Sequence, residues 1–262
     1  MPTTFALSRS EALDFLSSFG ENTEDLLVEV KSGRLTGAVG FDTFYFRKTH
    51  IFEKFKTAPP LVSGILSYRE GVMGITDLKK VMQFCKKCNA KAGVITFHQN
   101  ELGKQLTVKC GGMTLKVPTM KTINSYTKVP TIEKGLSKTE KNMFTQWKKS
   151  EIETHGVINV GNLKSISGFK NFFTYPDFLI STHVEEGEFF IKAGKQGTMQ
   201  LTIDTELTEA SGSNKRVQSK FGKWLMECTS LLSDGDAWIH MGENTFLFVQ
   251  QENSFLIVKN EA

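Results

Sequence analysis

The chain lacks the segments that take proteins into or across membranes. No apolar run approaches the roughly 18 residues that a membrane-spanning helix needs. The opening residues Met1–Phe5 have neither the basic stretch nor the apolar stretch of a secretion signal. The 4 cysteines show no framework spacing, which favours a reducing compartment over a disulfide-linked scaffold. These absences predict a protein that stays inside the cell and has no membrane partner.

The common catalytic signatures are missing as well. The sequence contains no phosphate-binding G-x-x-x-x-G-K-[ST], no G-x-G-x-x-G, no H-E-x-x-H and no G-x-S-x-G. Glu185 and Glu186 are adjacent acids, but they fall in a predicted hairpin turn, where solvent surrounds them. The histidines are scattered over predicted strands and turns: His50, His98, His155, His183 and His240. We therefore expect no enzyme activity and no cofactor.

One cysteine pattern needs a closer look, because Cys85-Lys86-Lys87-Cys88 is a CxxC motif. Together with His98 and Cys110 it offers four zinc ligands on paper. However, Cys85 falls on the apolar stripe of a predicted helix, and no second CxxC exists. A buried structural cysteine is the favoured interpretation, and no metal site is expected.

The bulk composition is that of a folded protein with room for two domains. Its 262 residues are enough for two cores of ordinary size. A hydrophobic content of 39% and an aromatic content of 11% exclude an intrinsically disordered chain. The net charge of +4 is mild but uneven, because residues 118–150 hold seven lysines and only two acids. This segment is either a solubilising linker or a segment that meets nucleic acid or an acidic partner.

The same order of elements is expected twice along the chain. A helix at 76–88 is followed by strands at about 93–98, 104–110 and 113–118. Near residue 220 a second helix is marked by Phe221, Trp224, Leu225 and Cys228, and strand-turn-strand sequence follows from 237 to 258. The two helices align with an offset of 143 residues, which indicates a duplicated domain and not a solenoid repeat.

Further elements are expected in the first half. Ser8 or Ser10 can cap a helix, because apolar residues recur behind them at helical spacing. That apolar face consists of Ala12, Phe15, Leu16 and Phe19. The remaining expected elements are a hairpin of 26–30 and 35–39 and strands at 42–47 and 61–68.

The second half restarts in the same manner. A strand at 157–160 precedes a helix that Asn162 caps. The side chains that this helix turns inward are Leu163, Ile166, Phe169 and Phe173. Strands are then expected at 178–184, 188–193 and 198–207, and a polar exposed loop at 208–216.

The fold class that follows is α+β, with two duplicated domains that each combine antiparallel sheets and two helices. The boundaries predicted from the sequence are 1–118 for the first domain, 119–152 for a connector and 153–262 for the second domain. The connector has weak periodicity and is long for a plain loop. It is expected to cross the outside of the molecule or to carry a short helix near 138–149.

Lysines on the outward faces of the predicted helices are the main functional signal. One solvated face of this kind is ordinary, but three helices in equivalent places share it, which indicates an anionic partner. The first helix differs, because it exposes Glu11 and Asp14. The candidate residues for binding this anionic partner are Lys79, Lys80, Lys86, Lys87, Lys164, Lys170, Lys215, Arg216, Lys220 and Lys223.

This duplicated order resembles a DNA polymerase sliding clamp of the two-domain type, similar to proliferating cell nuclear antigen and to phage clamps. The resemblance covers nearly the whole chain and is strongest over 75–117 and 217–258. It implies a processivity factor whose helices line a hole around duplex DNA, without sequence preference. The implied partners are a replicative DNA polymerase and a clamp loader. The implied location is a replication site, in the cytoplasm of a prokaryotic or phage-infected cell or in a nucleus.

The resemblance also implies a homotrimeric ring that closes by edge-to-edge pairing of strands. By position, the subunit interface would join Met113, Leu115 and Val117 of one copy to Thr198, Leu201 and Ile203 of the next. The implied partner-binding residues are Val39, Phe41, Phe44, Leu256 and Val258. The connector is longer and more basic than is usual in that family.

Two other functions stay open. A monomeric or dimeric viral processivity factor of the same fold would hold DNA through a basic face, and the lysine-rich connector favours it. A duplicated β-rich interaction protein would have no role on DNA. The mass in solution and the retention of DNA distinguish these possibilities.

Overall fold

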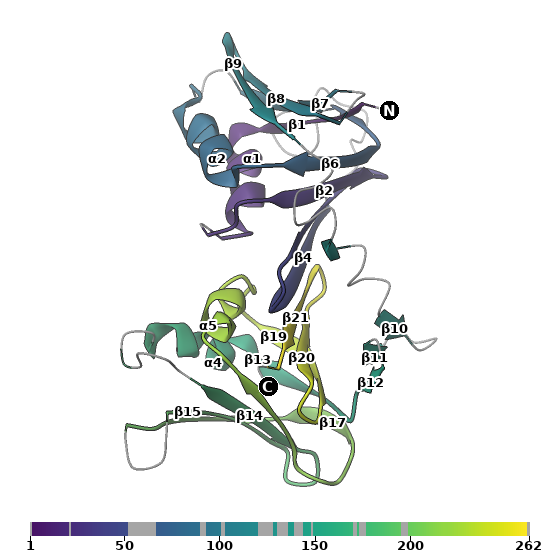
Figure 1. The fold of residues 1–262 in the computed structure, drawn as a ribbon, viewed down its shortest axis with the longest axis vertical. Coiled ribbons are helices and arrows are strands. Elements are labelled where there is room, and N and C mark those ends of the chain that lie inside the picture. The colour runs from purple at the N-terminus through teal and green to yellow at the C-terminus, as the bar shows by residue number, and fades with distance from the viewer. Residues whose placement is uncertain are drawn as a thin grey trace. The chain divides into compact units, whose positions relative to one another are not determined.

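The chain divides into two compact units, seen in the computed structural model of Figure 1. The first unit combines Met1–Phe41 with Arg47–Pro130, and the second combines Asp42–Phe46 with Thr131–Ala262. The structure describes residues 2–20, 22–51, 67–89, 93–100, 103–119, 128–129, 136–138, 144–147, 149–169, 172, 177–194 and 199–260. None of the helices in these ranges combines the length and the apolar character that crossing a bilayer demands.

The first unit packs two helices against two antiparallel sheets. Its elements are β1 (Thr3–Ser8), α1 (Arg9–Ser17), β2 (Leu26–Lys31), β3 (Arg34–Gly40), β4 (Phe44–Ile51), β5 (Ser67–Arg69), β6 (Gly71–Ile75), α2 (Leu78–Lys87), β7 (Val94–Gln99), β8 (Gln105–Cys110) and β9 (Met113–Pro118). One sheet has the order β5-β1-β7-β8-β9, and the other contains β4-β3-β2-β6. The first residues of β4, up to Phe46, belong to the second unit.

The second unit repeats this plan. Its elements are β10 (Leu136–Lys138), β11 (Phe144–Trp147), β12 (Ser150–Glu151), β13 (Thr154–Asn159), α4 (Val160–Ser165), a 3-10 turn (Ile166–Phe169), β14 (Phe178–His183), β15 (Glu188–Ala193), β16 (Leu201–Glu206), β17 (Thr208–Gly212), β18 (Val217–Phe221), α5 (Trp224–Thr229), β19 (Asp236–Gly242), β20 (Phe246–Gln250) and β21 (Ser254–Lys259). Its main sheets contain β17-β13-β19-β20-β21 and β16-β15-β14-β18.

The two units correspond strand for strand. The sheet order β5-β1-β7-β8-β9 matches β17-β13-β19-β20-β21, and β4-β3-β2-β6 matches β16-β15-β14-β18. The helices α1 and α2 occupy the same places in the order as α4 and α5. The duplicated α+β architecture predicted from the sequence is therefore confirmed, whereas the exact domain boundaries stay a prediction.

Local sequence explains why α1 begins where it does. Ser8 is the N-cap, and its hydroxyl accepts a hydrogen bond from the Glu11 backbone while the Glu11 carboxylate accepts one from the Ser8 backbone. This reciprocal capping box satisfies two backbone donors that the helix leaves open. Ser8, and not Ser10, is thus the cap. The expected apolar face of Ala12, Phe15, Leu16 and Phe19 is completely buried.

Three expectations in the second unit are wrong. The cap of α4 is Asn159, which accepts from the Gly161 N–H, while Asn162 donates to the Thr205 hydroxyl at 2.6 Å. Phe221 lies in strand β18 and not in a helix, because Val217, Ser219 and Phe221 alternate inward with period two. Residues 208–212 form β17, a polar strand that pairs with β13 at the sheet edge.

The connector also differs from expectation where the structure describes it. The short helix expected near 138–149 is replaced by the small antiparallel sheet β10-β11-β12. Trp147 of β11 is buried, with its ring 5.7 Å from that of Phe246 and 6.4 Å from that of Phe248. Aromatic packing on the second unit therefore fixes β11. Of the strand expected at 61–68, only its end lies in the described range, and Phe173 lies outside it.

A pair of histidines lies on adjacent strands of the second unit, with His240 buried and His155 half-buried. The Nδ1 atoms of His155 and His240 are 2.7 Å apart, and the Trp238 ring stacks on His240 at 6.4 Å. His240 is 1% exposed. Burial, with the neighbouring His155, lowers the pKa of His240 to about 3. Burial also lowers the pKa of His155, so both imidazoles are neutral in the folded protein near neutral pH.

We expect this pair to make the protein less stable in mild acid. In the unfolded chain a histidine takes up its proton near pH 6.5, whereas His240 in the folded protein stays neutral at pH 5. The free energy of unfolding should therefore fall by about 2 kcal/mol between pH 7 and pH 5 through His240 alone. Urea unfolding at the two pH values measures this fall. His240→Gln should make the fall smaller, whatever its effect at pH 7, and an unchanged fall would contradict this assignment.

Candidate nucleic-acid interface

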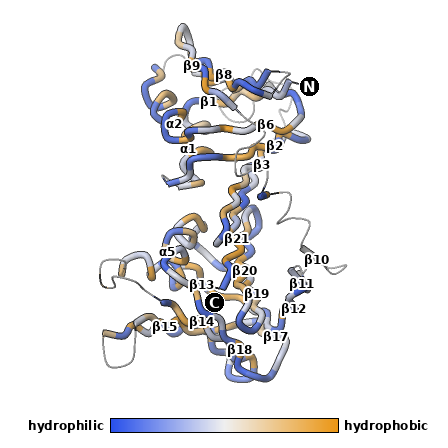
Figure 2. Tube along the Cα trace, viewed as in Figure 1, coloured by the Kyte–Doolittle hydropathy of each residue, from blue (hydrophilic) through white to orange (hydrophobic). Residues whose placement is uncertain are grey.

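Helix α2 has one buried face and one lysine-rich face. Leu78, Val81, Met82 and Cys85 are buried at helical spacing. The opposite side exposes Lys79, Lys80, Gln83, Lys86 and Lys87. The mixture of apolar and polar colour along α2 is visible in Figure 2. Because the apolar stripe fixes the rotation of the helix, the lysines are held toward solvent.

The start of α2 is set by Asp77. This residue is the N-cap, has a left-handed backbone with φ of 53°, and accepts a hydrogen bond from the Lys80 N–H. Its carboxylate also lies 2.6 Å from the Lys80 ammonium. Hydrogen bonding to the Lys80 side chain holds the pKa of Asp77 below its usual value. Asp77 is the acid nearest to the lysines in sequence, and it is used in capping.

The end of α2 is held by a residue from α1. The Arg9 guanidinium donates to the carbonyl oxygens of Cys85 at 3.2 Å and Lys86 at 2.8 Å. These carbonyls belong to the last turn, where the helix supplies no N–H four residues further on. The Cys85 carbonyl also accepts from the Cys88 N–H at 3.3 Å. A cation there also complements the helix dipole. Arg9 therefore positions the lysine-bearing end of α2.

The corresponding cations of the second unit are more constrained. Lys164 of α4 forms an ion pair with Asp234 at 2.6 Å. Lys223, at the N-cap of α5, places its ammonium 5.6 Å from the centre of the Trp224 ring. Both residues belong to the neighbouring helices α4 and α5, which pack together. Lys170 lies outside the described residues.

Three of the predicted DNA-binding residues are not on helices. Lys215 and Arg216 precede β18, and Lys220 is an exposed residue of β18 itself. Arg216 is paired with Glu186 at 3.2 Å and with Glu188 at 3.0 Å. The structure thus groups four of the predicted lysines on α2 and two cations on α4 and α5. The remaining three lie on the β18 strand and the segment before it.

The CxxC cysteines are structural. Cys85, Cys88 and Cys110 are reduced and buried, and burial raises the pKa of Cys85 to about 12. His98 is bound elsewhere, with its Nδ1 2.9 Å from the Thr4 hydroxyl. The buried-cysteine interpretation is confirmed by this burial.

A shallow hollow of about 390 Å³ lies in the second unit. Its walls include Glu209, Asp236, Glu252 and the Trp238 ring. Its carboxylates would repel phosphates. This hollow is therefore not part of a nucleic-acid interface.

Comparison with solved structures shows which fold this is. A Helicobacter pylori β clamp in complex with 5-chloroisatin superposes with a TM-score of 0.67 and 11% identity, covering 99% of this chain and 63% of the clamp. The Thermotoga maritima DNA polymerase III β subunit superposes with a TM-score of 0.66 and 10% identity, covering 99% of this chain and 65% of that subunit. The Archaeoglobus fulgidus PCNA bound to the C-terminal region of FEN-1 superposes with a TM-score of 0.61 and 14% identity, covering 98% of this chain and 97% of that PCNA. No protein-family model and no curated protein matches the sequence.

The fold is that of a DNA sliding clamp. The chain spans less than two thirds of the length of these bacterial clamps and almost all of the archaeal PCNA. At sequence identities of 10–14%, the similarity to these proteins establishes the fold alone. The activities and partners of those proteins are therefore matters for proposal.

Two strands of the clamp fold lie at sheet ends. The five-stranded sheet of the first unit ends at β9, and the four-stranded sheet of the second unit ends at β16. These strands carry five of the six predicted interface residues: Met113, Leu115 and Val117 on β9, and Leu201 and Ile203 on β16. Met113 is 40% exposed, whereas Val117 is buried. Thr198 lies outside the described residues.

The predicted partner-binding residues are mostly part of the core. Val39, Phe44, Leu256 and Val258 are all buried, and Phe41 is half-buried. Leu256 and Val258 are central residues of β21, which pairs with β20. Truncating the chain there would remove a strand of the sheet, so a partner site near these residues needs point substitutions to test it.

We expect the cap of α2 to depend on Asp77. Asp77→Ala removes the side-chain acceptor and puts a residue without a favourable left-handed conformation at φ of 53°, so it should destabilise the protein by about 1–2 kcal/mol. Asp77→Asn is the matched control, because it keeps the acceptor and tolerates this backbone while losing the charge. Urea unfolding should show the asparagine variant close to the original protein. Equal losses in both variants would assign the effect to the Lys80 ion pair.

Proposed function

We propose that the protein is a DNA polymerase processivity factor, a sliding clamp that encircles duplex DNA and tethers the replicative polymerase and other DNA-acting proteins. The observation that carries this proposal is the lysine face of α2 on a clamp fold. Lys79, Lys80, Lys86 and Lys87 are exposed together, and only Lys80 among them has an ion pair in the described residues.

The chemistry of this face suits a ligand that must slide. Ammonium groups attract phosphates wherever they lie along the duplex, and they do not read bases. The helix keeps the lysines in place, while their long side chains leave the contacts loose. The face therefore gives an attraction without a fixed register, and it requires no catalytic group.

A ring of three copies is the assembly we propose, and a junction inside the second unit supports it. There the Lys259 N–H donates to the Thr43 carbonyl, and the Tyr45 ring lies 5.2 Å from that of Phe255. These contacts join β21 to the start of β4, its neighbour in the sheet. By the correspondence of the units, β21 matches β9 and β4 matches β16. Pairing of β9 with β16 of another copy would repeat this junction between chains.

The proposed partners follow from the proposed role. The polymerase and a clamp loader would bind the clamp, and other DNA-acting proteins would share it. Among the similar structures, one Helicobacter pylori β clamp is bound to a DNA ligase peptide, and the Archaeoglobus fulgidus PCNA to a segment of FEN-1. We propose that short peptides dock on the second unit of this clamp near the start of β4 and β21, where Phe44, Leu256 and Val258 supply the underlying apolar packing.

The second candidate is a monomeric or dimeric viral processivity factor that grips DNA with one basic face. The uneven charge along the sequence favours it, because residues 118–150 hold seven lysines and two acids. Its mass in solution would be that of one or two chains. A β-rich interaction protein without a DNA role would retain no DNA at all.

We expect the protein to sediment as a trimer at micromolar concentration. Met113→Lys places a charge on the exposed end of β9 and should shift the mass toward the monomer without unfolding the chain. Val94→Lys is the matched control, because Val94 is similarly exposed at 38% but lies on β7, inside the sheet order. Analytical ultracentrifugation measures both. A monomer in the original protein would contradict the ring.

We expect DNA retention to depend on the α2 lysines together. Each change of Lys79, Lys86 or Lys87 to Ala should weaken binding modestly, without sequence preference, and lower the slope of log affinity against log salt by about 1. Lys109→Ala is the control, since this exposed lysine lies on β8 and not on a helix. Affinity measured over a salt series tests both. Binding insensitive to salt, or its complete loss from one lysine, would contradict this account.

A further inference from the structure

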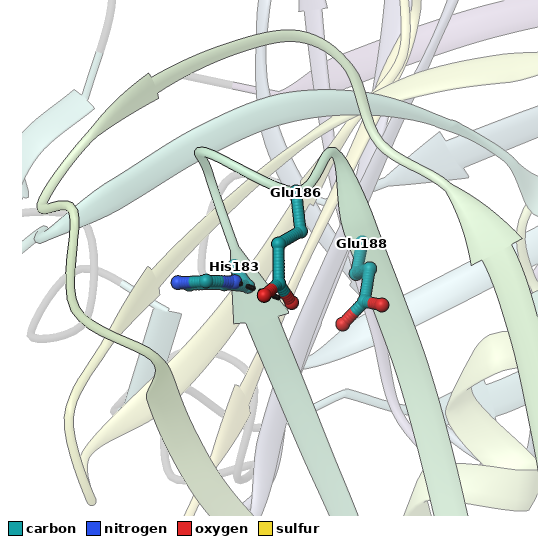
Figure 3. A group of neighbouring side chains, drawn as sticks. All are labelled: His183, Glu186 and Glu188. Atoms are coloured by element: carbon teal, nitrogen blue, oxygen red, sulfur yellow. Dashed lines mark ion pairs between the residues drawn. The ribbon is translucent and has the colours of Figure 1, made fainter.

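A cluster of three possible metal ligands lies at the β14–β15 hairpin of the second unit. His183 ends β14, Glu188 begins β15, and the two are directly paired across the hairpin. Glu186 comes from the turn between them, next to Gly187 with φ of 62°. One ligand atom from each residue lies within 4.8 Å of the others. Figure 3 shows Glu186 between the other two, with both carboxylates extending to the same side.

We propose that His183, Glu186 and Glu188 bind one divalent transition-metal ion of the zinc class. The donor set of one imidazole nitrogen and two carboxylate oxygens suits zinc, whereas magnesium and calcium prefer oxygen ligands alone. Water would complete the coordination, because this edge of the hairpin is open to solvent. The site is independent of the proposed clamp function.

The imidazole nitrogen is placed to act as a ligand. The Nδ1 atom of His183 is buried and has no hydrogen bond of acceptable geometry, although it lies 2.6 Å from the Glu186 carboxylate. Two ligands of a tetrahedral zinc ion lie roughly 3.4 Å apart. The Glu186 carboxylate must therefore move away from Nδ1 by less than about 1 Å for the two to bind one ion, and Glu186 is exposed enough to do so.

The hairpin is held by its own backbone hydrogen bonds. The Gly187 N–H donates to the Val184 carbonyl at 3.2 Å, and the Leu207 N–H donates to the Gly187 carbonyl at 2.7 Å. His183 is held at the strand end with a side chain only 16% exposed. Because the hairpin backbone is already ordered, metal binding would cost little further conformational entropy, and the affinity of the three ligands would not be reduced by it.

Arg216 is the cation that a metal must displace. Its guanidinium lies 3.2 Å from Glu186 and 3.0 Å from Glu188, and 5.0 Å from the centre of the Phe190 ring. A divalent ion bound to these oxygens would repel the nearby guanidinium, because both carry positive charge. The Phe190 ring gives the displaced guanidinium a second contact. Arg216 thus lowers the metal affinity and sets a competition between two cations.

Titration of the full, tag-free protein with zinc chloride tests the site. Isothermal calorimetry should show saturable binding of one ion per chain, and bound zinc should raise the melting temperature. His183→Gln and Glu188→Gln should each weaken binding by at least about tenfold and remove most of the thermal shift. Arg216→Gln should tighten binding, since it removes the competing cation.

Glu185→Gln is the matched control. Glu185 is an exposed acid of the same turn that does not belong to the ligand set, so its loss should leave the affinity unchanged. Absence of saturable zinc binding would overturn the proposal. Binding that survives His183→Gln and Glu188→Gln would overturn it too, because the ion would then lie elsewhere. Circular dichroism of each variant checks that the fold is retained.

Discussion

Burial of the apolar stripe on α2 is the constraint on which the functional surface depends. Leu78, Val81, Met82 and Cys85 can leave water only if the helix lies on its sheets in one rotation. In that rotation the lysines lie on the opposite face of the helix and are exposed to solvent. Asp77 then sets the start of the helix, and Arg9 satisfies carbonyls at its end. The basic face is therefore a product of core packing, and no special arrangement of the lysines themselves is needed to present it.

The two units share a topology but not a charge pattern. In the first unit only Lys80 of the four α2 lysines has an ion pair among the described residues, whereas in the second Lys164 is paired with Asp234 and Arg216 with two glutamates. Duplication preserves the apolar positions because each unit must bury its own core. Surface positions have no such requirement, so they can diverge. The same divergence allows one hairpin of the second unit to carry a histidine and two carboxylates in reach of one another.

The elements with strong periodicity were predictable from the sequence, and those set by distant partners were not. The stripes of α1 and α2 and the hairpin of β2 and β3 were correct, because local spacing and turn residues determine them. The polar strand β17 was missed, since its partner β13 lies about fifty residues away. The sequence does not distinguish strand from helix at Phe221, because this residue alternates with Val217 and Ser219 and also lies at helical spacing from Trp224 and Leu225. Of the candidate site, the α2 lysines were foreseeable, but Arg9 at the end of α2 required contacts that only the fold reveals.

The junction between β21 and the start of β4 has a consequence for direction. If β9 of one copy pairs with β16 of the next, the copies associate head to tail. Such contacts close a ring only when the rotation from one subunit to the next fits a whole number of copies. Every copy in the proposed ring would then point the same way around, so its two flat faces would be chemically different. A partner that recognises one face would always meet the duplex with the same polarity. The orientation of the bound partner along the duplex would then follow from the order of the strands in the clamp alone.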